Sequence, residues 1–354
     1  MNSAKGWLNG DDFDDEEELE LDSRDGRPLF EHYRFTVDKG QSAMRLDRFI
    51  TARLEDTSRS RVQQAAASDY ILVNGQIARS NYMIKPLDEI SIVLPFARRN
   101  YEILPENIPL DVKYEDDDLM VINKPAGMVV HPGHGNYTGT LMNALKYYLK
   151  DTPEQEAFLA HRIDKNTSGL LLVAKNEQTH AGLAQQFFEH TTKRIYVALA
   201  WGNVQEEEGT VDAPIARDPK DRMCFTVVPE EKGGKRAVTH YKVIERLGYV
   251  TLIECRLETG RTHQIRVHMD SIGHPLFNDD RYGGSKIVKG VIFSKYRRFV
   301  DNCFSIMPRH ALHARLLGFV HPTTNEELLF EQAPPEDFTK VLEKWKTYTM
   351  NNEQ

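Results

Sequence analysis

The chain has 354 residues, which is enough for two or more domains with a full-sized hydrophobic core. Its 45 basic and 53 acidic side chains give a formal net charge of −8, but the acidic excess is local. Residues 1–31 hold eleven acidic side chains against three basic ones, so the rest of the chain is neutral overall. The acidic balance therefore does not exclude a nucleic acid as a partner.

The three cysteines, Cys224, Cys255 and Cys303, are too far apart in the sequence for a zinc-binding CxxC pair. A sparse, odd number is typical of reduced cytosolic thiols rather than of a disulfide framework. No apolar run reaches membrane-spanning length, and no apolar segment follows a basic N-terminus. We therefore expect a soluble, cytoplasmic protein that has no membrane partner.

Changes in composition along the chain predict five segments. Residues 1–32 are acidic and poor in apolar side chains, which predicts a disordered leader, or alternatively an arm that mimics nucleic acid and screens a binding site. Residues 33–95 are predicted to form a small α/β domain, and residues 96–109 a linker with two prolines. Residues 110–345 are expected to form the large domain, and residues 346–354 a polar tail.

The small domain is predicted to hold two helices and a hairpin. The first helix has apolar residues at helical spacing, namely Leu46, Phe49, Ile50 and Leu54. Thr57 or Ser58 can cap the second helix, which carries Arg59 and Arg61 in its first turns. The pair Asn74-Gly75 suits a type I′ turn between two short strands, and a strand at Ile90–Val93 completes the hairpin.

The segments RLDRFI (Arg45–Ile50) and SRSRV (Ser58–Val62), together with this hairpin, resemble the alpha-L RNA-binding module first described in a small-subunit ribosomal protein. The resemblance implies that Arg59 and Arg61 contact RNA phosphates, which a guanidinium binds bidentately and a helix N-terminus also attracts. For either arginine taken alone, an ordinary solvated helix face is the alternative.

The large domain is expected to open with a short buried strand at Leu119–Ile122, followed by the sequence KPAGMVVHPG from Lys124 to Gly133. A helix is predicted over Thr140–Leu149. His131 and His134 suggest a metal pair, but no acidic or cysteine partner lies near them in the sequence. We therefore interpret both as turn histidines.

The sequence HRIDKNTSGLLLVAK, from His161 to Lys175, divides into a polar turn and an apolar run. The run Gly169–Ala174 is bounded by turn residues, which predicts a buried central strand. The strand then holds Arg162 and Asp164 at the rim of the core, a position that commonly carries function. On composition alone, Asp164 is explained as a turn residue whose carboxylate accepts from a backbone N–H.

Four further elements are predicted between residues 179 and 257: a helix at Thr179–His190, a strand at Lys193–Leu199 that contains Tyr196, a loop with a strand pair at Gly202–Lys235, and a half-buried strand at Val250–Leu257.

The sequence TGRTHQIRVH, Thr259–His268, predicts a tight turn that leads into a helix. Thr262 can cap this helix, and Gly273 can end it. Arg266 and Asp270 are four residues apart, so an exposed ion pair on the helix surface is the simplest structural role for Arg266.

The last part of the chain contains a basic, aromatic insertion at Ser285–Pro308, which is either a solvated loop or a segment that grips RNA. The sequence RHALHA, Arg309–Ala314, leads into a strand near Phe319, and a helix follows from Pro335.

These motifs, in this order, resemble the RluA/RluD family of RNA pseudouridine synthases, with the RluD branch the most similar. The resemblance implies an α+β fold in which a mixed, largely antiparallel sheet forms the catalytic domain. It also implies that Asp164 is the nucleophile, that Arg266 is its basic partner, and that Tyr196 stacks on the flipped uracil or lies near the transferred proton. Arg162 would fill the vacated stack, and Lys124 and His263 are assigned to substrate binding.

The activity implied is isomerisation of uridine to pseudouridine with no metal and no organic cofactor. The expected partner is large-subunit ribosomal RNA or a pre-ribosomal particle, with a stem-loop as the target, although other ribosomal sites and transfer RNA stay open. We expect a monomer, and no protein partner can be inferred. An ionised carboxylate suits the nucleophile's role, and Arg266 offsets the burial that would raise the pKa of Asp164.

Two other classes of function compete with this one. A non-catalytic RNA-binding or ribosome-assembly protein could keep the fold, but the joint presence of Asp164, Tyr196 and Arg266 disfavours it. A metal-dependent RNA hydrolase would need clustered carboxylate or histidine ligands, and the sequence shows no such cluster.

Overall fold

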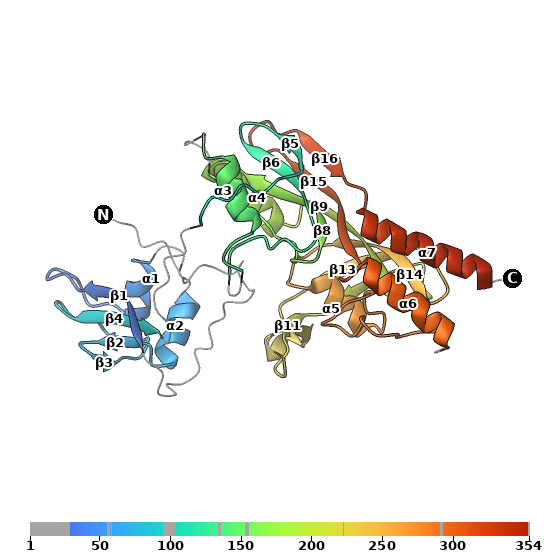
Figure 1. Cartoon of the computed structure of the whole chain (residues 1–354). Coiled ribbons are helices and arrows are strands. Elements are labelled where there is room, and N and C mark those ends of the chain that lie inside the picture. The colour runs from blue at the N-terminus through green and yellow to red at the C-terminus, as the bar shows by residue number, and fades with distance from the viewer. Residues whose placement is uncertain are drawn as a thin grey trace. The chain divides into compact units, whose positions relative to one another are not determined.

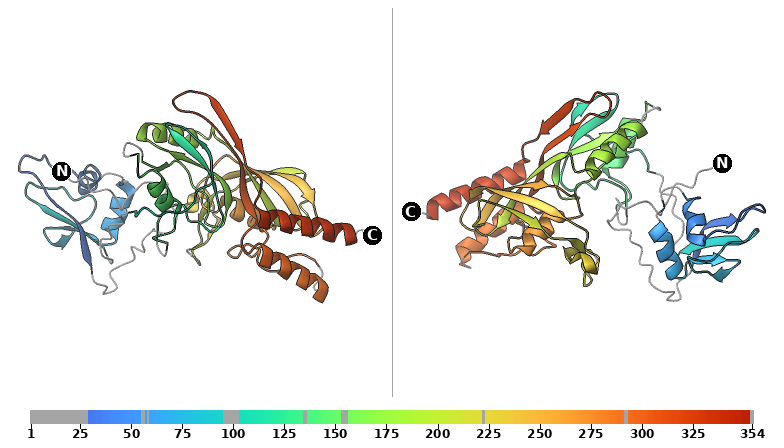
Figure 2. Two further views of the ribbon diagram at one scale, coloured as in Figure 1. Left: turned by 45° about the horizontal axis from the view of Figure 1, so that its top comes forward. Right: turned by 180° about the vertical axis from the view of Figure 1, so that it is seen from behind.

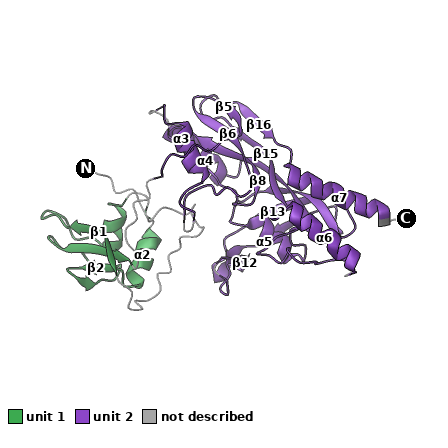
Figure 3. Ribbon diagram, viewed as in Figure 1, with its two compact units in different colours: residues 1–102 green, residues 103–354 purple. Residues whose placement is uncertain are grey.

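The computed structural model describes residues 29–54, 57, 59–94, 103–133, 136–152, 156–221, 223–290 and 293–352. The chain divides into two compact units, residues 1–102 and 103–354, and each has its own hydrophobic core (Figure 3). Several predictions fall outside the described residues: most of the leader, the cap at Ser58, His134, and the first half of the linker.

The first unit is a four-stranded antiparallel sheet with two helices (Figure 1). Its elements are β1 (Phe30–Thr36), α1 (Leu46–Thr51), α2 (Arg59–Ala67), β2 (Ile71–Val73), β3 (Gln76–Ile77) and β4 (Glu89–Leu94). The strand order is β1-β4-β2-β3. Asn74 and Gly75 have φ values of 51° and 75°, as both central residues of a type I′ turn require, so the predicted hairpin is confirmed.

The boundary of the acidic leader needs a correction. β1 begins at Phe30, inside the range 1–32 that was assigned to the leader, and it buries His32 and Tyr33. The strand was missed because charged residues such as Glu31 and Arg34 separate its few apolar positions, so the acidic composition of the leader seemed to continue into it.

The second unit is built on a ten-stranded sheet with the order β10-β13-β14-β9-β15-β8-β6-β5, to which β7 adds at β8 and β16 at β15. The strands are β5 (Val112–Glu115), β6 (Leu119–Lys124), β7 (Phe158–Leu159), β8 (Ser168–Ala174), β9 (Lys193–Trp201), β10 (Glu208–Asp212), β13 (Val238–Arg246), β14 (Val250–Leu257), β15 (Leu312–Val320) and β16 (Glu327–Glu331). A separate hairpin joins β11 (Ile215–Arg217) to β12 (Phe225–Val227), and a short 3-10 turn, Glu230–Lys232, follows it.

Among the strands that the structure describes, β8 and β15 form the one parallel pair. The mixed, largely antiparallel sheet with its helices confirms the predicted α+β fold class. β8 is buried along its whole length, which explains its continuous apolar sequence. A strand that is covered on both faces has no solvent-exposed side on which polar residues would alternate with apolar ones.

Helices cover both faces of the large sheet (Figure 2). They are α3 (Leu141–Tyr148), α4 (Glu177–Phe188), α5 (Gln264–Ser271), α6 (Ser294–Ile306) and α7 (Glu336–Asn352). α3 and α5 pack on one face, whereas α4, α6 and α7 pack on the other. Among the described helices, none is long and apolar enough to cross a membrane.

Two predictions for the C-terminal part are wrong. The basic insertion at residues 285–308 is not a loop, because α6 occupies most of it and buries Tyr296 and Val300 against the sheet. Residues 346–352 of the predicted tail are the end of α7, where the ring of Tyr348 lies 4.5 Å from that of Phe299. The many charged side chains of α6 obscured its apolar stripe, and the edge strands β5 and β16 were missed for the same reason.

Candidate active site

Asp164 lies in the turn that leads into β8, and strand pairing on both sides of β8 holds that turn. Gly169 pairs with Lys124 of β6 and with Ala314 of β15. Its φ is 115°, and a Cβ at this position would collide with the carbonyl group of Ala314. Glycine is therefore needed where β8 and β15 approach each other, directly after the turn that presents Asp164.

Lys124 also stabilises this turn. Its side chain is fully buried, and Nζ donates to the carbonyl oxygens of Pro125, Met128 and Lys165 at 2.8, 2.9 and 3.1 Å. Burial lowers the pKa of Lys124 to about 7, whereas the three carbonyl acceptors favour its ammonium form. All three donors of the ammonium are used within the protein, so Lys124 joins two turns, and its contact with substrate stays a prediction.

Arg309 fastens the Asp164 turn to α7. Its Nη1 donates to the carbonyl oxygen of Asn166 at 3.1 Å. Its Nε and Nη2 bind the carboxylate of Asp337 at 2.7 and 2.9 Å. A bidentate pair of this kind fixes direction as well as distance, so the turn is held to an element that lies far along the chain.

Arg266, on α5, lies between two carboxylates. Its Nη1 is 3.1 Å from Oδ2 of Asp164, and its Nε and Nη2 donate to Asp279 at 2.7 and 2.9 Å. Asp279 has no exposed surface and the Arg266 side chain is 4% exposed, whereas Asp164 is 20% exposed. Of the three charged groups, Asp164 is therefore the one that a substrate can reach.

The family resemblance had implied that Arg266 is the partner of Asp164, and the structure brings these residues together across 102 positions of the chain. The alternative, an exposed ion pair between Arg266 and Asp270, is wrong because Arg266 is buried and points to Asp164 and Asp279.

His263 and Tyr282 pack beside Arg266. Nδ1 of His263 is 2.8 Å from the Tyr282 hydroxyl, which accepts from the backbone N–H of Phe225 at 3.0 Å. Because the hydroxyl oxygen accepts there, its own proton is free to be donated to Nδ1. The Tyr282 ring centroid lies 5.0 Å from the guanidinium carbon of Arg266, a distance at which a cation and a ring attract each other.

The start of α5 differs from the prediction. The helix begins at Gln264, and His263 precedes it in the left-handed conformation with φ of 54°. The side-chain oxygen of Gln264 accepts from the backbone N–H of Arg261 at 2.9 Å and from the Thr259 hydroxyl at 2.7 Å. Thr262 is therefore not the cap, because a buried Gln that turns back to the preceding loop satisfies these donors instead.

Tyr196 lies on β9, opposite Cys255 of β14 and Ala314 of β15. It shares the hydrophobic core with Ile163 and Ile265, which are the chain neighbours of Asp164 and Arg266. Burial raises the pKa of Tyr196 to about 12, so its hydroxyl is protonated at neutral pH. In the part of the chain that the structure describes, this hydroxyl has no hydrogen-bond partner.

Asp164 is ionised at neutral pH. Burial opposes its charge, but the electrostatic effects of His263, Arg266 and His310 outweigh burial and lower the pKa of Asp164 well below its usual value. Burial also lowers the pKa values of His263 and His310, to about 4 and about 3, so both rings are neutral at pH 7. Arg266 is therefore the cation that keeps Asp164 charged under physiological conditions.

The other predicted residues belong to the Asp164 turn or to the first unit. Arg162 is exposed on the Asp164 turn, two residues before the carboxylate. Arg59 and Arg61 belong to α2 of the first unit, where Nε of Arg59 bonds the buried carboxylate of Asp47 at 3.0 Å. Among the described residues no group of three or more metal-ligating side chains gathers.

Sequence inspection missed Asp279, Tyr282 and the role of Arg309. Asp279 and Asp280 are adjacent acids in NDDRY, yet the first is fully buried and the second exposed. No local pattern separates them, because the partner of Asp279 comes from α5 and not from its own segment. The apolar residues just before them, Leu276 and Phe277, mark a buried segment and were the available signal.

Comparisons with known proteins identify the family to which the chain is similar. The family described as RNA pseudouridylate synthase matches residues 118–271, and the S4 domain matches residues 44–90. An RNA pseudouridine synthase of Chlorobaculum parvum is 44% identical over 88% of this chain and 97% of its own length. The ribosomal large subunit pseudouridine synthase D of Zymomonas mobilis is 42% identical over 85% of this chain and 94% of its own.

A solved structure extends the similarity to three dimensions. The human RNA pseudouridylate synthase domain containing 4 superposes with a TM-score of 0.52 at 25% identity, covering 66% of this chain and 92% of the human chain. This chain therefore belongs to the RluA/RluD family of RNA pseudouridine synthases, isomerases that act on uridine in RNA, and carries an RNA-binding S4 domain before its catalytic domain.

Proposed function

We propose that this chain converts specific uridines in a stem-loop of large-subunit ribosomal RNA to pseudouridine, with Asp164 as the nucleophile. The observation that carries the proposal is the contact of Asp164 with Arg266, because it leaves one ionised, partly exposed carboxylate at the end of a fixed turn. An ionised carboxylate held rigidly by a charge partner is suited to nucleophilic attack.

The net reaction needs only what these side chains supply. The bond between N1 and the ribose carbon breaks, a bond from C5 to the same carbon forms, and the proton on C5 is replaced by one on N1. No electron is gained or lost and no group is donated, so the reaction consumes no second substrate. The protonated Tyr196 belongs to the same hydrophobic cluster as Ile163, the chain neighbour of Asp164, and the charge of Asp164 helps to raise the pKa of Tyr196. We propose that the Tyr196 ring stacks on the uracil.

The target base must leave its stack before it can meet a carboxylate at the rim of a sheet. We propose that Arg162, exposed on the same turn, occupies the space that the base vacates. Loop nucleotides are the easier targets because their bases are already partly unstacked. Arg59 and Arg61 of the S4 domain would contact phosphates, and such contacts add affinity rather than chemistry.

The ribosomal target is supported by relatives named ribosomal large subunit pseudouridine synthase D, from Zymomonas mobilis and Nitrosomonas europaea, at 42% and 40% identity. The proposal includes a cytoplasmic enzyme that acts as a monomer and needs no metal.

The test is a chemical map of pseudouridine across total RNA from cells with and without the gene. We expect one or a few positions in large-subunit ribosomal RNA to revert to uridine when the gene is absent. A map in which only transfer RNA changes would show that transfer RNA is the target instead of ribosomal RNA. A map without any change would contradict the proposed activity in the cell.

A further inference from the structure

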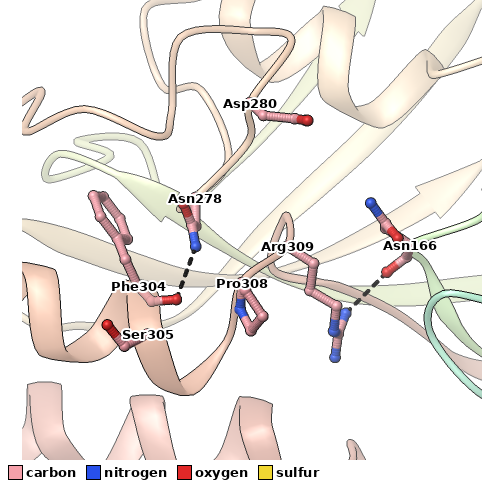
Figure 4. Close-up of a pocket in the computed structure, with 7 residues that line it drawn as sticks. All are labelled: Asn166, Asn278, Asp280, Phe304, Ser305, Pro308 and Arg309. Carbon is pink, nitrogen blue, oxygen red and sulfur yellow. Dashed lines mark hydrogen bonds between the residues drawn. The ribbon is translucent and has the colours of Figure 1, made fainter.

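A cavity of about 320 Å³ opens beside the candidate active site (Figure 4). Its lining includes Asn166, which is two residues after Asp164, and both Asn278 and Asp280, which flank Asp279. Two residues of chain span at most about 7 Å. The cavity is therefore next to the turn that presents Asp164 and to the segment that holds Arg266, but it contains neither side chain.

The apolar side of the cavity is rigid. Phe304, at the end of α6, packs its ring 4.9 Å from that of Phe277 and 6.3 Å from that of Trp201. The amide of Asn278 donates to the carbonyl oxygens of Phe304 and Met307 at 3.3 and 2.6 Å, and so ties α6 to the loop on the other side. Walls fixed in this way need little ordering when a ligand enters.

Two polar side chains that line the cavity have no hydrogen-bond partner among the described residues. The Asp280 carboxylate is exposed, and neither it nor the side-chain amide of Asn166 has a hydrogen bond or an ion pair within the described part of the chain. Ser305 donates to a backbone carbonyl of its own helix, which leaves its oxygen free to accept. A carboxylate only accepts hydrogen bonds, so a ligand that satisfies Asp280 must offer donors.

A basic stripe on α6 leads toward the cavity. Lys295, Arg297 and Arg298 are exposed, and among the described residues none of them has an acidic partner. Lys295, Arg298 and Ser305 are separated by three and seven positions, so they follow one face of the helix. Ten residues of helix are about 15 Å long, which suits a stretch of a few phosphates.

We infer that this cavity is a subsite for an RNA base that lies near the target uridine and carries an exocyclic amino group. The phosphate backbone follows Lys295 and Arg298, and the amino group of adenine, cytosine or guanine donates to Asp280. Uracil has no amino group and would turn carbonyl oxygens toward the carboxylate. The inference rests on the proposed function, because a bound RNA substrate is what brings such a base next to Asp164.

The test uses the full chain and a pool of stem-loop transcripts that are randomised at the nucleotides flanking the target uridine. Two fractions of the pool are sequenced, the transcripts that bind and the transcripts that gain pseudouridine. We expect the wild-type protein to disfavour uridine at one flanking position by roughly tenfold in both fractions. Asp280→Asn, which keeps the shape but removes the charge, should reduce this preference to within about twofold.

Two further variants separate a specific subsite from a general charge effect. Asp151→Asn removes an exposed carboxylate after α3, which Figure 1 places at the other end of the second unit from α6, and should keep the wild-type preference. Lys295→Ala combined with Arg298→Ala should weaken binding equally for all flanking sequences and reduce the slope of log affinity against log salt by about two.

A wild-type protein without any preference at a flanking position, or an Asp280→Asn variant that keeps the full preference, overturns the inference. If wild-type protein forms no pseudouridine in any transcript, the proposed function fails instead. The bound fraction still decides the subsite in that case, because it is measured without turnover.

Discussion

Asp279 binds two nitrogens of Arg266, Nε at 2.7 Å and Nη2 at 2.9 Å, and leaves Nη1 for Asp164 at 3.1 Å. Asp279 is itself fixed, because its Oδ1 accepts from the backbone N–H groups of Arg281 and Tyr282 at 3.1 and 3.2 Å. Its bidentate contact sets the plane of the guanidinium, which the single contact with Asp164 could not do. The orientation of the Asp164 partner therefore comes from a carboxylate that no substrate can reach.

Asp279→Asn should lower kcat by roughly tenfold to hundredfold, because a small displacement of a catalytic partner is costly, while RNA affinity stays near wild type. An Asn side chain offers one acceptor where Arg266 needs two, so the guanidinium can turn away from Asp164. Single-turnover rates and filter binding on the same preparation measure the two quantities. Asp270→Asn on the exposed side of α5 is the matched control and should be mild, and equal losses in both variants would contradict the role of Asp279.

Arg266→Ala should be nearly inactive and also less stable, by on the order of 3–5 kcal/mol, because it leaves the fully buried Asp279 without its partner. Arg266→Lys keeps the charge but cannot bind both carboxylates with a planar fork, so we expect it to recover stability more than activity. Thermal melts and turnover assays compare the variants. A lysine variant with wild-type turnover would show that only the charge matters.

Asp164→Asn should abolish detectable pseudouridine formation while the melting temperature stays near wild type. Arg266 keeps both contacts to Asp279, so this substitution does not leave a buried cation without a partner. RNA affinity should also persist, because it depends mainly on basic contacts elsewhere. The measurement is pseudouridine content in a ribosomal RNA transcript, after mass spectrometry excludes deamidation to Asp. Appreciable turnover would falsify the assignment of the nucleophile.

Two histidines with lowered pKa values, the half-buried His161 and the buried His310, should make the fold sensitive to mild acid. Burial lowers the pKa values of His161 and His310 to about 3, whereas a histidine in the unfolded chain titrates near about 6.5. The unfolded state therefore binds these protons more readily, so the stability that the neutral rings contribute is complete above pH ~6.5 and is lost as the pH falls toward 3. Melting temperatures should fall below pH ~6.5, and more gently for His310→Gln. Parallel curves for the two proteins would argue against this origin.

Removal of residues 1–95 should leave a folded but slow enzyme, since the second unit has its own core and holds Asp164, Tyr196 and Arg266. The loss should appear in RNA affinity and in a shallower dependence of affinity on salt, because the S4 domain adds phosphate contacts. Binding titrations at several salt concentrations compare the two forms. Unchanged affinity and slope would show that the S4 domain does not contact this RNA.

Much of the fold could be predicted because its signals are local. The run Gly169–Ala174 identifies a strand buried on both faces, and Asn74-Gly75 allows few turns other than type I′. The helix α6 was missed because exposed Lys and Arg residues dominate its composition, although its buried residues, Tyr296, Val300 and Cys303, follow helical spacing.

The site was predictable only as far as a family pattern reached. Asp164 and Arg266 were paired by resemblance, since no spacing rule relates residues 102 positions apart. The structural role of Lys124 was not predicted: its place in a motif suggested contact with substrate, and the structure shows in addition that its ammonium donates to three carbonyl oxygens. Whether a single polar side chain is buried depends on segments that are distant in the chain, so its burial could not be predicted from the local sequence.

The parallel pairing of β8 with β15 also sets when, during synthesis, the protein can become active. Ser168 and His313 are hydrogen-bonded partners 145 residues apart. Arg309, which binds the Asp164 turn, is itself held by Asp337 of α7. A contact of such long range forms late, after the chain between its ends has been made. A growing polypeptide therefore carries Asp164 without the contacts that orient it, and we expect no modification of RNA before α7 has been synthesised.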